Sequence, residues 1–133
     1  AYIQCDLKST HRTWVRIPRE LWPPSWKGRG FKAPMCLLRK ALYGHPESGG
    51  HWERHLTEAV VAIGGRTAPG HPSSFWRPDT KMLMTVYVDD LLFAGPATGH
   101  KAIWDALSAH PIAIDPPEPL SLFLGRTHVR NKL

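Results

Sequence analysis

Two adjacent carboxylates, Asp89 and Asp90, interrupt an otherwise apolar run from Thr85 to Gly95. Burying two like charges side by side is costly unless a cation neutralises them. The run therefore cannot be an ordinary core strand along its whole length. The carboxylates have to lie where a cation can reach them, and this requirement constrains the fold more than any other stretch of the chain.

The residues on either side of the acidic pair indicate where it lies. Met82 to Val88 and Leu91 to Ala94 are rich in β-branched and aromatic residues, which predicts two short strands with Asp89 and Asp90 in the tight turn of a β-hairpin. Hard oxygen ligands suit Mg²⁺ or Mn²⁺, and such a site is typical of phosphoryl transfer. The sequence thus predicts that Asp89 and Asp90 are metal ligands and catalytic residues; the alternative is an ordinary polar turn.

Length and composition favour one intracellular globular domain. The chain has 133 residues, 42% of them hydrophobic and 21% charged, and no apolar run approaches the roughly 18 residues that a membrane span needs. We therefore expect no membrane insertion. The first residues lack the basic and apolar regions of a signal peptide. Cys5 and Cys36 lack metal-ligand spacing and are expected to be free thiols.

Positive charge is concentrated in the first third of the chain. Between Lys8 and Lys40 the only acid is Glu20, and the basic residues are Lys8, Arg12, Arg16, Arg19, Lys27, Arg29, Lys32, Arg39 and Lys40. Such a segment suits nucleic-acid phosphates, although a solvated basic surface is the alternative. The segment also contains Trp residues and four prolines, which exclude a long helix but allow a strand over 13–17. Its Trp and Arg side chains either stack on bases and bind phosphates or simply hold a long loop together.

The rest of the chain predicts short helices and strands. His51 to Ile63 has an apolar stripe at helical spacing and ends at Gly64-Gly65, and Gly99 to His110 predicts a second amphipathic helix. Strands are expected over 73–77, 112–115 and 120–129. His51, Glu53 and His55 raise the possibility of a zinc site, but the further ligands that known zinc motifs require are absent. We expect these two histidines to face solvent.

Four segments together resemble a known family. Tyr87-Val88-Asp89-Asp90-Leu91-Leu92, followed by Phe93-Ala94-Gly95, is similar to the active-site hairpin of reverse transcriptases, most closely those of copia-type long-terminal-repeat retrotransposons. Further matches in the family's order are residues 1–4, residues 38–52 with Lys40-Ala41-Leu42-Tyr43-Gly44, and residues 120–125. The resemblance implies that residues 120–125 belong to a hairpin that supports the primer strand. The second segment departs from the family at Glu47 and at Gly49-Gly50. A carboxylate at position 47 would repel a triphosphate.

The resemblance implies an α+β fold, a partial polymerase palm in which a small antiparallel β-sheet carries two helices packed on one face. Residues 1–133 would form a single partial reverse transcriptase domain that lacks the N-terminal fingers and the strand with the first catalytic Asp. That Asp would fall four residues before Ala1. The implied activity is RNA-dependent DNA polymerisation with two divalent ions about 4 Å apart. Because one metal ligand is missing, we predict that this chain alone does not polymerise.

The resemblance also implies roles for single residues and partners. It implies that Tyr2, Tyr43 and Gly44 bind the nucleotide. The residues implied to contact template and primer are Arg39, Lys40, Tyr87, Leu124, Gly125 and Arg126. His128 and Arg130 would lie near a primer phosphate. The partners would be a deoxynucleoside triphosphate, an RNA or DNA template with its primer, and the rest of a Pol polyprotein, whose element undergoes DNA integration. Two alternatives stay open: a relic that binds nucleic acid without chemistry, and a decayed fragment with no role.

Overall fold

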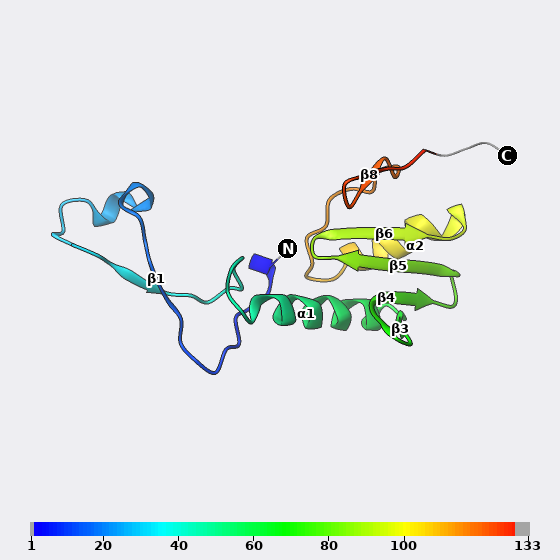
Figure 1. Ribbon diagram of the computed structural model, residues 1–133, viewed down its shortest axis with the longest axis horizontal. Helices are drawn as coiled ribbons and strands as arrows, with labels where there is room; N and C mark the ends of the chain where they lie inside the picture. Colours follow the sequence, from blue (N-terminus) through cyan, green and yellow to red (C-terminus); the bar gives the residue numbers. More distant parts are fainter. Residues whose placement is uncertain (1, 130–133) are drawn as a thin grey trace. The chain divides into compact units, whose positions relative to one another are not determined.

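The computed structural model describes residues 2–129 and has a mixed α and β architecture (Figure 1). The contacts within the chain divide it into two compact units, Tyr2–Glu53 and Arg54–Leu133, which are called here the N-terminal and the C-terminal unit. Helix α1 (Ser48–Ala62) begins in the N-terminal unit and ends in the C-terminal one. No helix among residues 2–129 is long and apolar enough to cross a membrane.

The N-terminal unit consists mostly of loops and short 3-10 turns. Its regular elements are η1 (Tyr2–Gln4), β1 (Trp14–Arg16), η2 (Arg19–Leu21), η3 (Pro24–Trp26) and β2 (Met35–Leu37). Strands β1 and β2 pair antiparallel, with Val15 opposite Cys36. The prolines keep the intervening segment from forming a longer helix, since a proline in a helix interior removes a backbone hydrogen bond and clashes with the preceding turn.

The C-terminal unit is built on an antiparallel sheet whose strands lie in chain order: β3 (Arg66–Ala68), β4 (His71–Arg77), β5 (Met82–Tyr87) and β6 (Asp90–Ala94). Helix α2 (Ala97–Ser108) follows β6, and a small hairpin of β7 (Leu122–Phe123) and β8 (Arg126–Thr127) comes later. Figure 1 shows β4, β5 and β6 running side by side, with α2 behind them.

One face of this sheet is covered by α2. Met84 lies opposite Phe75 on β4 and opposite Phe93 on β6, so the three side chains share a face. Phe93 meets Trp104 of α2 edge to face, with ring centroids 5.3 Å apart. Met82 and Met84 are 0% and 1% exposed, and they form the centre of this core. Trp76 and Leu83 point to the other face and are 40% and 38% exposed, as expected for an antiparallel sheet covered on one side.

Helix α1 confirms most of its predicted apolar stripe. Trp52, Leu56, Ala59 and Val60 are all buried, whereas Ile63 follows the last residue of the helix and is half-buried. The helix ends in a Schellman motif, in which the Gly65 N–H donates to the Val60 carbonyl and the Gly64 N–H donates to the Val61 carbonyl, each at 2.9 Å. Gly64 has a φ of 88°, a conformation that favours glycine. The predicted end of the helix at Gly64-Gly65 is therefore confirmed.

Two other predicted elements were wrong. The segment expected to be a strand over residues 112–115 has no strand pairing, and residues 120–129 do not form one long strand. They fold back on themselves as β7 and β8, in agreement with the hairpin that the family resemblance implies there. Leu124 and Gly125 at the turn have φ of 51° and 72°, the conformation of a two-residue hairpin turn. Residues 2–4, by contrast, form the 3-10 turn η1. Ala1 lies outside the described residues.

A candidate metal and nucleic-acid site

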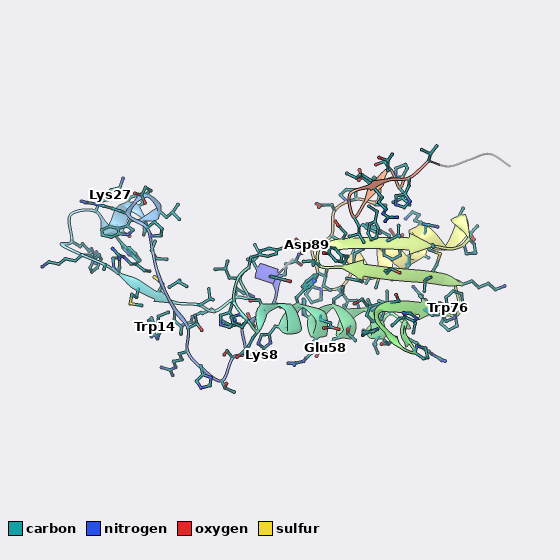
Figure 2. The ribbon with its side chains drawn as sticks, viewed as in Figure 1. Lys8, Trp14, Lys27, Glu58, Trp76 and Asp89 are labelled. Atoms are coloured by element: carbon teal, nitrogen blue, oxygen red, sulfur yellow. The ribbon has the colours of Figure 1, made fainter. Side chains whose placement is uncertain are left out.

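The acidic pair lies at the tip of the β5–β6 hairpin, as Figure 2 shows for Asp89. Tyr87 pairs with Asp90, so the two turn residues are Val88 and Asp89. The prediction that Asp89 and Asp90 form the turn was thus wrong by one residue, because Asp90 is already the first residue of β6. The register follows from the core pair of Met84 and Phe93, since a shift by one residue would turn both side chains to the opposite face.

The turn itself is strained at Val88. This β-branched residue has a φ of 53°, in the left-handed region that such side chains avoid. A residue held there costs about 1–3 kcal/mol and persists only where the surrounding structure determines it. Strain of this kind occurs preferentially at functional sites. The hairpin therefore fixes the backbone of Asp89 in a conformation that local sequence preference alone would not select.

Strand alternation places Asp90 on the face of the sheet that α2 leaves open. Phe93 points toward α2, and Leu91 shares its face of the sheet. Because side chains alternate along a strand, Asp90 and Leu92 point to the other face. Tyr87, directly across from Asp90, is 56% exposed, and both carboxylate residues are exposed as well. The pair is thus hydrated and not buried, and a ligand approaching the open face meets an aromatic ring beside a carboxylate.

The donor set fits a hard divalent ion only in part. Among residues 2–129 no group of three or more His, Cys, Asp or Glu side chains comes together to hold a metal. Mg²⁺ and Mn²⁺ are often bound through one or two carboxylates, with waters and substrate phosphates in the remaining positions. Asp89 and Asp90 suit that mode of binding, because they are exposed oxygen donors at a fixed turn, but they do not form a complete cage.

The expectation that His51 and His55 face solvent was wrong. The side chain of His51 is only 11% exposed, and the Nε2 atoms of both histidines are buried. His51 Nε2 lies 3.6 Å from a carboxylate oxygen of Glu47, one helical turn earlier. The buried side of α1 is broader than its apolar stripe, because helix packing covers the residues that border the stripe as well.

The predicted nucleotide-binding residues meet within the N-terminal unit. The rings of Tyr2 and Tyr43 lie 4.4 Å apart between centroids and are tilted by 32°. Gly44 follows with a φ of 86°, which explains a glycine at that position. Tyr43 is 55% exposed, so its ring is accessible to a ligand. The carboxylates Asp89 and Asp90 belong to the other unit.

Ser48 is a structural residue that the sequence did not predict. It is fully buried at the first position of α1, and its Oγ accepts a hydrogen bond of 2.9 Å from the Leu42 N–H. This bond ties the backbone just before Tyr43 and Gly44 to the start of the helix. The available signal was a small hydroxyl residue where the helix begins, a position that such residues favour.

The predicted nucleic-acid contacts are mostly exposed. Lys40 forms an ion pair of 2.8 Å with Asp6, and the two side chains are 53% and 64% exposed, so water screens the pair. Arg39 and Arg126 are exposed. Leu124, 51% exposed, and Gly125 form the turn between β7 and β8. His128 is exposed too, and Arg130 lies outside the described residues.

Both cysteines are free, as predicted. Cys5 is buried, and its Sγ donates a hydrogen bond of 3.2 Å to the Tyr2 carbonyl. Burial is the main cause that raises the pKa of the Cys5 thiol above its usual value. The thiol therefore stays protonated and unreactive at neutral pH, and Cys5 belongs to the buried core.

Comparison with known proteins places the chain among transposon proteins. It is 33% identical over 107 residues to the retrovirus-related Pol polyprotein from transposon RE1 of Arabidopsis thaliana, and 32% identical over 106 residues to the corresponding polyprotein from transposon RE2. Each match includes 77% of this chain and spans only 7% of the polyprotein. No family model and no solved structure matches the chain significantly. The chain therefore belongs with the retrovirus-related Pol polyproteins of transposons, as a relative of one short segment of them.

Proposed function

We propose that the chain is a segment of an RNA-dependent DNA polymerase, the reverse transcriptase of a copia-type element, and that its C-terminal unit is part of the polymerase palm. The observation that carries the proposal is the pair of exposed carboxylates at the strained tip of the β5–β6 hairpin. The similarity to Pol polyproteins of transposons supports it. Such an element functions inside the cell, so we propose an intracellular location.

In this proposal Asp89 and Asp90 hold Mg²⁺ or Mn²⁺. Such ions, when bound, activate a hydroxyl nucleophile and neutralise the charge that develops during phosphoryl transfer. The chain's own groups do the rest. Tyr87 presents a ring beside the carboxylates, the primer and template contact the exposed residues Arg39, Lys40 and Arg126, and Tyr2, Tyr43 and Gly44 contact the deoxynucleoside triphosphate.

Metal binding tests this assignment directly. We expect the double variant Asp89→Asn/Asp90→Asn to bind Mn²⁺ at least about tenfold more weakly than the wild-type chain, because it loses both charged oxygen donors. The measurement is a Mn²⁺ titration followed by water-proton relaxation. A matched control is Asp115→Asn/Glu118→Gln, which removes the same charge from an exposed stretch without strand pairing. If both double variants bound Mn²⁺ equally weakly, the loss of affinity would come from net charge alone, and the metal site would be refuted.

The chain by itself is expected to be inactive in template–primer extension. Two carboxylates are present where the family's site uses three, and among residues 2–129 no third metal ligand joins them. The assay measures incorporation of labelled deoxynucleotides with Mg²⁺ or Mn²⁺ present. Product that appears with the wild-type chain and is lost in Asp89→Asn would show that the two carboxylates suffice, contrary to this expectation.

A second candidate function is a module that binds nucleic acid without chemistry. The observation that favours it is the set of exposed cations in the N-terminal unit, from Lys8 to Lys40. Such a module would bind with a steep salt dependence, because each neutralised phosphate releases counterions. Binding would survive in Asp89→Asn/Asp90→Asn, whereas a polymerase segment would lose Mn²⁺ affinity in the same variant.

A further inference from the structure

The N-terminal unit contains a cavity of about 410 Å³ that neither the acidic hairpin nor the tyrosine pair uses. It is formed by the end of β1, by η2 and by the chain just before β2. Three cations, Arg16, Arg19 and Lys32, line it together with the rings of Trp22 and Phe31. Ligand pockets measure roughly 300–1,000 Å³, so this cavity suits a small ligand or one unit of a polymer.

The aromatic part of the cavity is held by contacts within the loop. The Trp22 Nε1–H donates a hydrogen bond of 2.9 Å to the Ile17 carbonyl, which fixes the indole. Trp22 meets Trp26 edge to face at 6.2 Å between centroids, and Trp26 meets Phe31 in the same way at 5.8 Å. The two interpretations of these rings are therefore compatible: they hold the loop together, and Trp22 and Phe31 also border an open cavity.

The charge around the cavity is positive. The Arg19 guanidinium lies 5.9 Å from the centre of the Trp22 ring, a cation–π contact that keeps this charge near the aromatic wall. Glu20 is the one acid between Lys8 and Lys40, and it does not line the cavity. A ligand that satisfies this lining has an anionic group for the cations and a flat ring for Trp22 and Phe31.

We propose that this cavity binds one nucleotide of a single-stranded nucleic acid. The phosphate lies against Arg16, Arg19 and Lys32, and the base lies against Trp22 or Phe31. A single strand fits because its bases present free faces for stacking on aromatic side chains, whereas the faces of bases in a duplex are already stacked. This cavity and the proposed polymerase site would both bind nucleic acid, but the cavity includes neither Asp89 nor Asp90 and needs no metal.

The charge contribution is tested with two double variants that remove the same number of cations. Arg16→Gln/Lys32→Gln removes two that line the cavity, and Lys27→Gln/Arg29→Gln removes two exposed ones outside it on the same loop, where Figure 2 labels Lys27. The probe is a fluorescein-labelled decathymidylate, titrated at one fixed salt concentration with EDTA present. We expect the variant that lacks the two cavity cations to bind the strand about tenfold or more weakly than the wild-type chain, and the control variant less than about threefold more weakly. Losing two positive charges weakens the general attraction to phosphates equally in both variants, so the difference between them measures the cavity.

The base contribution is tested on the wild-type chain, so it does not depend on a variant that folds. An abasic strand of the same length carries the same phosphates without bases. We expect it to bind at least about fivefold more weakly than decathymidylate. The difference should become smaller in Phe31→Leu, which removes one of the two rings and keeps an apolar side chain against Trp26. A duplex of equal length should bind more weakly than the single strand.

Equal losses of affinity for decathymidylate in the two double variants would mean that the strand binds a diffuse basic surface, and would overturn the proposal. Equal affinity for the thymidylate and abasic strands, or a preference for duplex, would overturn it as well. Because EDTA removes divalent ions, failure here leaves the metal site at Asp89 and Asp90 untouched, and failure of Mn²⁺ binding leaves this result untouched.

Discussion

Replacing Met82 by Ala is expected to destabilise the C-terminal unit by about 3 kcal/mol, within the range for truncating a fully buried Met. Met82 is 0% exposed and stands where β5, the end of β6 and α2 meet. Its Sδ lies 2.9 Å from the position that a Cβ on Gly99 would occupy, so little space separates it from the helix. The cavity left by the truncation cannot close without moving α2.

A matched control for this variant is the next residue along the strand. Leu83 points to the open face and is 38% exposed, so Leu83→Ala is expected to cost about 1 kcal/mol or less. The measurement is hydrogen exchange of the β5 and β6 backbone amides under native conditions, which reports on this unit alone. Equal loss of protection in the two variants would contradict the assignment of Met82 to the core and of Leu83 to the open face.

Gly95→Ala is expected to cost about 3 kcal/mol through steric overlap and backbone strain together. A Cβ on Gly95 would stand 2.5 Å from the Met82 Sδ and 2.7 Å from the Lys81 carbonyl oxygen. The sulfur belongs to a flexible side chain and can move, but the carbonyl belongs to the backbone of the β4–β5 turn. Gly95 also has a φ of 155°, which L side chains rarely adopt.

The control for Gly95 is a glycine with an unusual φ and no crowding. Gly70 has a φ of 75°, and nothing lies within 4 Å of a Cβ built on it. Gly70→Ala should therefore show the backbone effect alone, about 1 kcal/mol. Amide exchange in β5 again provides the measurement. If the two variants lost equal amide protection, the Lys81 backbone would be able to move away at little cost, and the close approach at Gly95 would not be required.

These two positions bear on the candidate site because they hold the base of the hairpin whose tip carries the carboxylates. Met82 begins β5, and Gly95 directly follows β6. The tip itself is exposed and includes a strained Val88. The position of Asp89 therefore depends on a tightly packed base several residues away, and a change there should weaken Mn²⁺ binding without removing a ligand.

Local patterns were sufficient for the elements whose signals lie close together in the chain. The apolar stripe from Trp52 to Val60 and the glycine stop after it predict α1 because helix formation depends on neighbours within one or two turns. The hairpin at Asp89 and Asp90 was predicted for a similar reason, since the two strands are adjacent in the sequence. Helix α2 began two residues earlier than predicted, at Ala97, a small difference at an element boundary.

Contacts between distant residues were not predictable in this way. The ladder between β1 and β2 joins Trp14 to Leu37, and the stacked pair joins Tyr2 to Tyr43. Nothing in either local stretch specifies its partner. The cavity beside Trp22 also forms only when residues before η2 and residues before β2 come together, so its lining could not be listed from the sequence.

The sequence by itself determined the mixed α and β character, the two helices, the free thiols and an acidic hairpin tip, because periodicity, turn residues and charge act over short distances. The tertiary structure decided which carboxylate lies in the turn, which face of the sheet Asp90 points to, and that His51 and His55 have buried ring nitrogens. Those outcomes depend on burial. The packing of Met84, Phe75 and Phe93 against one another sets the strand register, and the register sets the direction of every side chain on the hairpin.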